Sequence, residues 1–247
     1  MEITQAWISG ASSGLGAALV ATAPDAVTGI RDLSRSGGTS GTTHVPVDLA
    51  TPDGWDRAQT DFADVIGSLA DTTDDPTVLL IHNAGTITPI GPAGSTDLAA
   101  YRTAVLLDAA APPILGTGFL AAAADAGLPA QIVMITSGAA TSVYEGWSHY
   151  CAAKAAVDHW VRTVGAEQQR RGADGARVLA VSPGVVDTPM QAEIRRMDAE
   201  QFPRVDKFRQ LHADGALVSP EQAARGVWSV LGDASLPTGS VTDLRNR

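Results

Sequence analysis

The chain has 247 residues, 45% of them hydrophobic, and a formal net charge of −10. A chain of this length can bury the core of one α/β domain, and its basic residues form no run that could follow nucleic-acid phosphates or attract anionic lipid. These features predict one domain over residues 1–247 and exclude nucleic acid and membrane as expected partners.

Two further features narrow the class of protein. Cys151 is the single cysteine, which excludes an intrachain disulfide and a thiolate-cluster metal site, and His149 and His159 have no metal-site spacing. The N-terminal residues lack a basic region followed by an apolar one, and no stretch reaches about 18 uncharged apolar residues. The sequence therefore predicts a cytoplasmic protein without a metal ion.

Short apolar runs alternate with longer alanine-rich segments in which apolar residues recur at helical spacing. The short runs predict strands over 6–9, 27–30, 44–47, 78–81, 132–136, 178–182 and 240–242. The longer segments predict helices over 14–23, 54–69, 98–124, 148–171 and 220–231. Because right-handed crossovers place helices on both faces of parallel strands, this order predicts an α/β fold with a doubly wound parallel sheet of about seven strands.

A glycine-rich turn, SGASSGLG over residues 9–16, follows the first predicted strand and opens a helix. Glycines at positions 10, 14 and 16 permit a tight turn and the close approach of a pyrophosphate to the positive end of that helix. A plain connection between strand and helix is the alternative, and the flanking strand and helix favour the phosphate site.

This turn has the form G-x-x-x-G-x-G and resembles that of the short-chain dehydrogenase/reductase family, whose similarity extends through nearly the whole chain. The resemblance implies a Rossmann-type fold and a nicotinamide cofactor. It also assigns an adenine contact to Asp48-Leu49, an N-N-A-G element to residues 82–85, and a P-G-x-x-x-T closure over the nicotinamide to residues 183–188. The cofactor-binding residues expected from turn and resemblance are Gly10, Ser12, Ser13, Gly14, Leu15, Gly16, Arg31, Asp48, Leu49, Asn83, Ala84, Gly85, Tyr150, Lys154, Pro183, Gly184, Val186 and Thr188.

The end of the second predicted strand bears on the choice of cofactor. It carries no carboxylate that could bond a ribose 2′-hydroxyl, whereas Arg31 offers a planar cation for a 2′-phosphate, with Arg35 as a second candidate. The sequence therefore predicts NADP(H) rather than NAD(H). A solvated pair of Arg31 with Asp32 is the alternative.

Proton transfer requires an acid beside the substrate oxygen, and Tyr150 and Lys154 lie one helical turn apart on one face of a predicted helix. A nearby cation stabilises a phenolate and lowers the pKa of the phenol. Ser137 follows the fifth predicted strand, where its hydroxyl can hold the substrate oxygen. The resemblance makes Tyr150 the general acid/base and lets Lys154 lower its pKa and bind the nicotinamide ribose; a solvated helix face is the alternative.

Position 108 departs from the family pattern. The family places an asparagine there, which bends the helix and holds a relay water, but this chain has Asp108, and its only asparagines are Asn83 and Asn246. Asp108 is therefore a candidate catalytic residue that could act through its main chain or pair with Lys154.

The substrate side is expected near residues 189–216, where the family has a variable lid. Met190 and Trp147 are candidate substrate contacts beside Ser137, with core packing as the alternative. The sequence around Trp147 resembles the branch that holds sepiapterin and benzil reductases. Asn246 stands where sepiapterin reductases carry a pterin-binding carboxylate, which favours a simpler ketone, diketone or aldehyde.

These features predict an NADP-dependent carbonyl reductase with Tyr150 as general acid/base. A catalytically silent NADP(H)-binding sensor or scaffold and an NAD-dependent alcohol dehydrogenase are the alternatives. The resemblance further implies a homodimer or homotetramer formed through the long helices.

Overall fold

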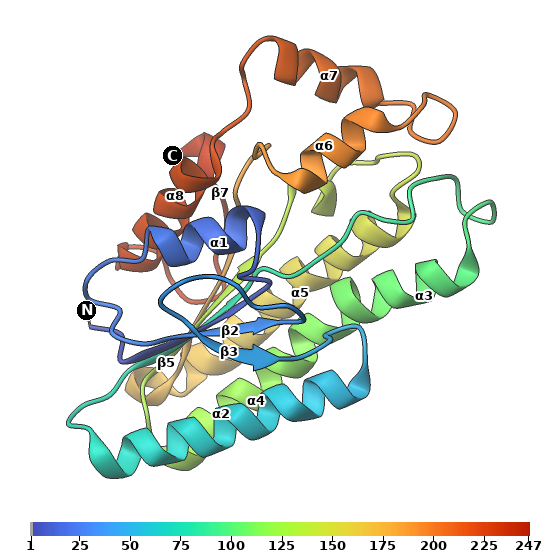
Figure 1. The fold of residues 1–247 in the computed structure, drawn as a ribbon. Coiled ribbons are helices and arrows are strands. Elements are labelled where there is room, and N and C mark those ends of the chain that lie inside the picture. Colours follow the sequence, from blue (N-terminus) through green and yellow to red (C-terminus); the bar gives the residue numbers. More distant parts are fainter. Residues whose placement is uncertain (1) are drawn as a thin grey trace.

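The computed structural model of the chain describes residues 2–247 and places seven parallel strands in one sheet, in the order β3-β2-β1-β4-β5-β6-β7 (Figure 1). The reversal of strand order between β1 and β4 makes the sheet doubly wound, which confirms the predicted Rossmann-type fold. The strands are β1 (Gln5–Ser9), β2 (Ile30–Ser34), β3 (Thr43–Pro46), β4 (Val78–His82), β5 (Ala130–Ile135), β6 (Arg177–Ser182) and β7 (Val241–Asp243).

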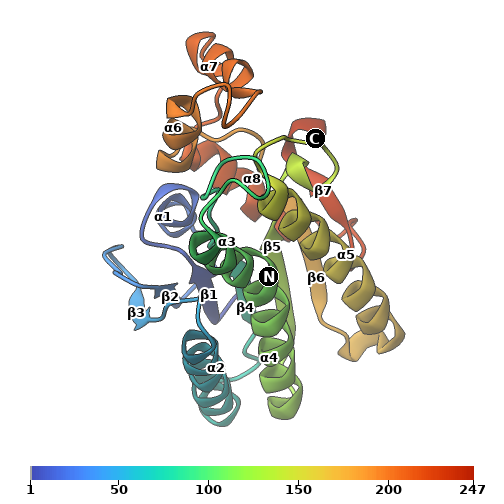
Figure 2. The same cartoon turned by 90° about the vertical axis from the view of Figure 1, so that its right-hand side faces the viewer.

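Helices cover both faces of the sheet, and two more lie beyond its carboxyl edge (Figure 2). One face carries α1 (Gly14–Ala21) and α8 (Pro220–Gly232), and the other α2 (Pro52–Thr72), α4 (Ala111–Ala126) and α5 (Ser148–Arg170). A π-helical turn, η1 (Leu106–Ala110), joins α3 (Leu98–Val105) to α4. The lid contains α6 (Pro189–Arg196) and α7 (Val205–Ala213), and short 3₁₀ turns are η2 (Gly138–Ala140), η3 (Gly172–Asp174) and η4 (Leu244–Asn246).

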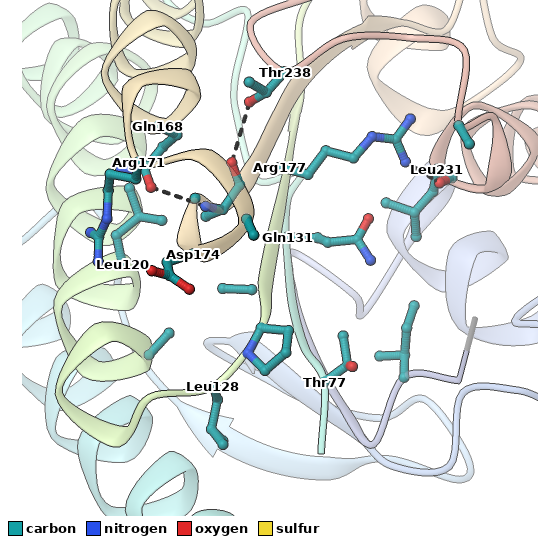
Figure 3. A pocket seen from close by; sticks show the side chains of 18 of the residues that line it. Thr77, Leu120, Leu128, Gln131, Gln168, Arg171, Asp174, Arg177, Leu231 and Thr238 are labelled. Atoms are coloured by element: carbon teal, nitrogen blue, oxygen red, sulfur yellow. Dashed lines mark hydrogen bonds between the residues drawn. The ribbon is translucent and has the colours of Figure 1, made fainter. Parts of the chain in front are cut away.

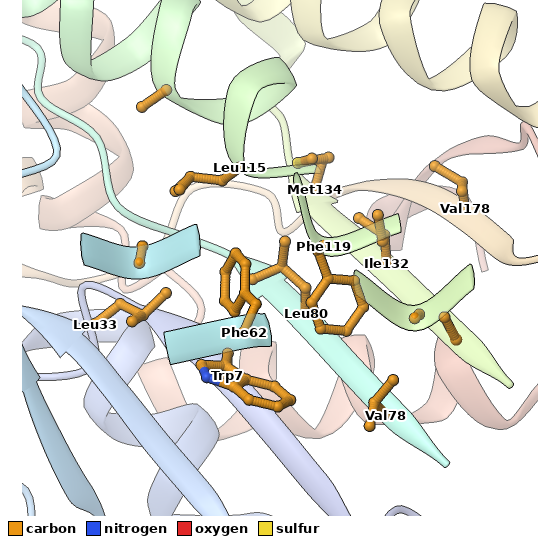
Figure 4. Close-up of a cluster of buried hydrophobic side chains, with 14 of the residues drawn as sticks. Trp7, Leu33, Phe62, Val78, Leu80, Leu115, Phe119, Ile132, Met134 and Val178 are labelled. Carbon is orange, nitrogen blue, oxygen red and sulfur yellow. The ribbon is translucent and has the colours of Figure 1, made fainter. Parts of the chain in front are cut away.

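Three aromatic rings form the centre of the core between the sheet and helices α2 and α4 (Figure 4). Trp7, Phe62 and Phe119 are fully buried and meet edge to face, with ring centroids 5.3 to 5.6 Å apart. The Trp7 indole N–H donates to Asp61 at 2.7 Å, so the polar atom of this buried ring is satisfied. These contacts fix α2 and α4 against β1.

The second strand lies later in the chain than its apolar run predicted. The sequence pattern placed it at 27–30, but Ile30–Ser34 pairs with β1, with Ala6 opposite Ile30 and Ser9 opposite Leu33. Its charged residues resembled a loop, but Arg31 is accommodated in the strand because its guanidinium pairs with Asp61 on α2. The carboxyl end of the strand therefore falls at Ser34, and Arg31 lies inside the sheet.

Within the described residues, one helical stretch, Leu98–Ala126, is long and apolar enough to cross a membrane by length and composition alone. The same stretch packs against α2 and α5 and supplies Leu115 and Phe119 to the core. Burial in the core therefore accounts for part of its apolar character, with 39% of the apolar window buried.

Replacing Phe119 with alanine should lower the free energy of unfolding by about 3 to 5 kcal/mol, because it leaves a cavity among rings that interlock. Urea unfolding followed by circular dichroism measures the loss. Leu98→Ala is the matched control, since the Leu98 side chain is 70% exposed. Equal losses in the two variants would contradict the role assigned to the aromatic centre.

Candidate active site

A cavity of about 980 Å³ runs along the carboxyl edge of the sheet, between the loops that follow β1, β4, β5 and β6. A second hollow, of about 1080 Å³, lies at the opposite edge near the amino ends of β5 and β6 (Figure 3). None of the residues predicted for the site lines that second hollow. The chemistry expected from the sequence therefore belongs to the carboxyl edge, where doubly wound sheets bind their ligands.

The glycine turn forms one end of this cavity. Gly10 and Gly14 adopt positive φ angles of 66° and 53°, which favour glycine. A Cβ on Gly16 would lie 2.0 Å from the carbonyl oxygen of Gly10, so only glycine fits behind the turn. Ser13 begins α1 without a side-chain cap, which leaves the N–H groups of the first turn free for an anion.

A cluster of hydrogen bonds ties this turn to the loop after β4. Ser9 Oγ accepts the backbone N–H groups of Asn83 and Ala84 at 2.9 Å, and the Asn83 amide donates to the carbonyls of Ser9 and Gly10. Asn83 therefore positions the turn, besides lining the cavity with Ala84.

The predicted role of Arg31 needs a correction. Its guanidinium donates to both carboxylate oxygens of Asp61, at 2.8 and 2.5 Å, and Arg31 does not line the cavity. The alternative pair with Asp32 is not formed, because that carboxylate is fully buried within the sheet and Arg31 is paired with Asp61. Arg35, directly beyond the end of β2, does line the cavity, and within residues 2–247 it forms no ion pair.

The three residues expected to carry proton transfer meet in the middle of the cavity. Ser137 follows β5 and hydrogen-bonds the phenol of Tyr150 on α5. One turn along α5, Lys154 donates from Nζ to the carbonyl oxygen of Ile135 at 2.9 Å, and the same atom lies 5.5 Å from the Tyr150 ring centroid. Tyr150 is 9% exposed and Lys154 is 6% exposed, so both polar ends are largely withdrawn from solvent.

The environment of the phenol opposes its ionisation. Burial raises the pKa of Tyr150 strongly, the negative charge of Asp108 raises it further, and the hydrogen bond with Ser137 lowers it. The lowering by Lys154 that the sequence predicted is not found: Lys154 is not among the groups that shift the pKa of Tyr150, and desolvation of the phenolate is the largest effect. Tyr150 therefore holds its proton at neutral pH, which is the state a proton donor needs.

Asp108 lies in the π-helical turn beneath the loop after β4 and is 1% exposed. Its Oδ1 accepts the Thr86 N–H at 2.8 Å, while Oδ2 has no hydrogen-bond partner among the described residues. Burial raises the pKa of Asp108 to about 7, against the opposing effects of Lys154 and the Thr86 N–H. Asp108 does not line the cavity and forms no ion pair with Lys154 within 4 Å.

Two more titratable side chains surround the buried ammonium. His82 stands where the family has an asparagine, and burial together with Lys154 lowers its pKa to about 3, so the imidazole is neutral. Burial raises the pKa of Asp158, against the opposing effects of Thr136, Arg162 and Lys154. Burial also lowers the pKa of Lys154, against the pull of Asp108 and Asp158.

At the substrate end, Trp147 is 4% exposed and stacks on Phe202 of the lid segment with ring centroids 4.5 Å apart. It also meets Tyr150 edge to face at 5.6 Å. Trp147 and Met190 both line the cavity and both belong to the apolar cluster under the lid. Each residue therefore serves as a cavity wall and as part of the core packing.

The structure brings most of the predicted site together. Gly16, Arg31 and Asp108 are the ones that do not line the cavity. The predicted residues that do line it are Gly10, Ser12, Ser13, Gly14, Leu15, Asp48, Leu49, Asn83, Ala84, Gly85, Ser137, Trp147, Tyr150, Lys154, Pro183, Gly184, Val186, Thr188 and Met190.

Three titratable lining residues, Tyr144, Lys207 and Arg245, were not predicted from sequence patterns. They come from the loop after β5, from α7 and from η4, and no local motif connects them. The one signal that could have singled out Lys207 is that the chain has only two lysines, the other being Lys154. Among residues 2–247, no group of three or more His, Cys, Asp or Glu side chains could hold a metal ion.

Comparison with known proteins supports the resemblance. Residues 8–243 match a family model described as enoyl-(acyl carrier protein) reductase. The chain is 34% identical over 241 residues to the benzil reductase ((S)-benzoin forming) of Bacillus subtilis (strain 168), which covers 96% of this chain and 97% of the relative. It is 32% identical over 169 residues to the sepiapterin reductase of Mus musculus, with 67% of this chain and 62% of the relative covered. The crystal structure of the KRED1-Pglu enzyme shares the fold, with a TM-score of 0.78 at 24% identity over 97% of this chain and 100% of that chain.

Replacing Asp108 with asparagine should stabilise the protein at pH 8 but not at pH 4. The pKa of Asp108 is higher in the folded protein, about 7, than its ordinary value of 3.8, so the folded state binds the extra proton. The wild type therefore loses stability as pH rises from about 4 to 7, by on the order of 4 kcal/mol from this group, and asparagine cannot ionise.

Urea unfolding of both proteins at pH 4, 6 and 8 measures this difference. Asp125→Asn is the control, because Asp125 is an exposed carboxylate on α4. A difference between wild type and Asp108→Asn that stays constant with pH would show that burial does not hold the Asp108 proton.

Proposed function

The chain belongs to the short-chain dehydrogenase/reductase family, and on that premise we propose that it is an NADP(H)-dependent carbonyl reductase acting on a small ketone, diketone or aldehyde. The arrangement of Ser137, Tyr150 and Lys154 carries this proposal. These three side chains meet in one cavity whose far end is the glycine turn. Similarity to a benzil reductase over nearly the full length of both chains favours an aromatic ketone or diketone among the substrates.

The residues present fit a dinucleotide. The uncapped start of α1 offers N–H groups to a pyrophosphate, and the tight contacts of Gly10 and Gly16 with neighbouring residues hold the turn in a compact shape. Asp48 and Leu49 line the adenine side, while Pro183, Gly184, Val186 and Thr188 line the nicotinamide side. When bound, the reduced nicotinamide supplies a hydride.

Side chains of the protein bind the carbonyl oxygen of the substrate and supply the proton that it receives. The Ser137 hydroxyl holds the substrate carbonyl oxygen, and Tyr150 donates its phenolic proton to that oxygen as the carbon becomes tetrahedral. The raised pKa of Tyr150 keeps this proton in place before the reaction. Lys154, anchored on the Ile135 carbonyl, then stabilises the phenolate until solvent returns a proton.

Asp108 is a positioning residue in this scheme. Its Oδ1 holds the Thr86 N–H, and so orients the loop that carries Gly85. A Cβ on Gly85 would lie 3.1 Å from Asp108 Oδ1 and 3.8 Å from Lys154 Nζ, so the carboxyl group and the ammonium face the same narrow gap. With a pKa of about 7, Asp108 gains its negative charge beside Lys154 as the pH rises through neutrality.

The proposed preference for NADP(H) now depends on Arg35, which takes the role that the sequence had assigned to Arg31. Arg35 lines the cavity just beyond β2, where a ribose 2′-phosphate of a bound dinucleotide would lie, and no carboxylate of β2 lines the cavity to compete with it. By family resemblance we further propose a cytoplasmic homodimer or homotetramer that pairs through the long helices α4 and α5.

Initial rates with NADPH and NADH on benzil, 1-phenylpropane-1,2-dione, benzaldehyde and acetophenone test the proposed activity. Reduction with NADPH above NADH supports it. Tight NADPH binding without turnover would instead identify a sensor or scaffold, and preferential oxidation of an alcohol with NAD⁺ would identify an NAD-dependent alcohol dehydrogenase.

Tyr150→Phe should lower kcat by about 10²-fold or more, because it removes the proton donor and keeps the ring. The affinity for NADPH, measured by fluorescence titration, should stay within about twofold. Tyr101→Phe is the control, since Tyr101 carries a phenol on α3 that does not line the cavity. A parallel loss of nucleotide affinity in Tyr150→Phe would make this tyrosine structural.

Arg35→Met should raise KM for NADPH by about tenfold and leave KM for NADH nearly unchanged, because only the phosphorylated cofactor loses a charge-assisted contact. Arg31→Met is the matched control. It should lower stability, since it leaves the Asp61 carboxylate without its cationic partner, but it should not change the ratio of the two KM values. A changed ratio in Arg31→Met alone would restore the original assignment.

A further inference from the structure

The substrate end of the cavity is positively charged, although the chain as a whole carries a net charge of −10. Two cationic side chains, Lys207 and Arg245, line that end, and no carboxylate does. The one carboxylate that lines the cavity, Asp48, belongs to its adenine side. Cationic side chains outnumber carboxylates along the whole cavity, since Arg35 and Lys154 line it too, and Lys207 and Arg245 are the cations at the substrate end.

Lys207 extends from α7 toward the loop after β5. Its Nζ donates to the Tyr144 hydroxyl at 3.1 Å and lies 5.4 Å from the centroid of that ring and 5.7 Å from that of Phe208. Within residues 2–247, no carboxylate lies within 4 Å of Lys207, and the adjacent Asp206 pairs with Arg209 instead. The ammonium is thus aimed at the cavity with its charge uncompensated.

Arg245 approaches from the other side, on η4 after β7. Its guanidinium pairs with Asp243, and its Nη2 lies 3.4 Å from the point that a Cβ on Gly138 would occupy. Gly138 directly follows Ser137, which holds the substrate oxygen in the proposed reaction. Arg245 therefore lies close to the proposed reacting carbonyl with its charge largely balanced by Asp243, whereas Lys207 has no such carboxylate partner.

We propose that the substrate carries a carboxylate near its reacting carbonyl, and that Lys207 and Arg245 bind this carboxylate together with the Tyr144 hydroxyl. The apolar body of the substrate then packs against Trp147 and Phe208, and its ketone reaches Ser137 and Tyr150. This inference rests on the proposed reductase function and names the substrate class: an aromatic keto acid. The reaction reduces it to the hydroxy acid, with a hydride from NADPH added to the carbonyl carbon and a proton from Tyr150 added to the oxygen.

A purely structural role for Lys207 predicts a different effect of its replacement on the two kinds of substrate. If its contacts with Tyr144 and Phe208 serve only to hold α7 over the cavity, losing the ammonium affects charged and uncharged substrates alike. A role in substrate recognition affects the charged substrate selectively, because only that substrate loses a charge-assisted contact. The comparison of an acid with its own ester separates the two.

The test compares benzoylformate with methyl benzoylformate in the wild type, Lys207→Met and Arg196→Met. Methionine keeps the apolar stem of the lysine and removes the charge. Arg196 is the control because it is an exposed cation of the same lid that does not line the cavity. The quantity measured is the ratio of kcat/KM for the acid to kcat/KM for the ester.

The ratio should fall about tenfold in Lys207→Met, mainly through KM of the acid, and remain within about twofold of wild type in Arg196→Met. Tyr144→Phe should lower it in the same direction, and added salt should lower it in the wild type because the site is open to solvent. An unchanged ratio in Lys207→Met, while the ester is still reduced, overturns the carboxylate site alone. No reduction of ester, acid or benzil by the wild type would overturn the proposed function itself.

Discussion

The candidate site is organised around one buried ammonium group, that of Lys154 in the wall of the cavity. Lys154 is 6% exposed and is anchored on the carbonyl oxygen of Ile135, the last residue of β5. A buried charge destabilises the fold unless it has hydrogen-bond or charged partners. For Lys154 these partners are the Ile135 carbonyl and two nearby carboxyl groups. Asp108 and Asp158 both draw the ammonium toward its charged form, while His82 stays neutral beside it.

This arrangement has a consequence for the residue at position 108. An asparagine there would offer a neutral amide, whereas Asp108 can add a full negative charge at the same place. Burial raises the pKa of Asp108 to about 7, so its charge changes near neutral pH, and that charge in turn raises the pKa of Tyr150. The ionisation of Tyr150 thus depends on pH through Asp108, a residue that does not line the cavity.

The two ends of the cavity are built differently. At the cofactor end, backbone groups dominate, and the hydrogen bonds of Ser9 and Asn83 hold the turn in place. At the substrate end, side chains dominate, and they come from the loop after β5, the lid and the last turn of the chain. A site made of backbone groups depends little on side-chain identity and can bind a ligand that all members of a family share. A site made of side chains changes with their identity, so it can differ between members that bind different ligands.

The alternating elements, the glycine turn and the one-turn spacing of Tyr150 and Lys154 could be predicted from the amino-acid order alone, because each of these is a local pattern whose geometry follows from the backbone. The pairing of Arg31 with Asp61 on α2, which leaves Arg35 at the cavity, could not be predicted in this way, since the register of β2 against β1 sets which residue reaches the strand end. The tertiary structure likewise brought Lys207 and Arg245 together from distant segments, because which side chains converge on a cavity depends on how the chain packs and not on their spacing along it.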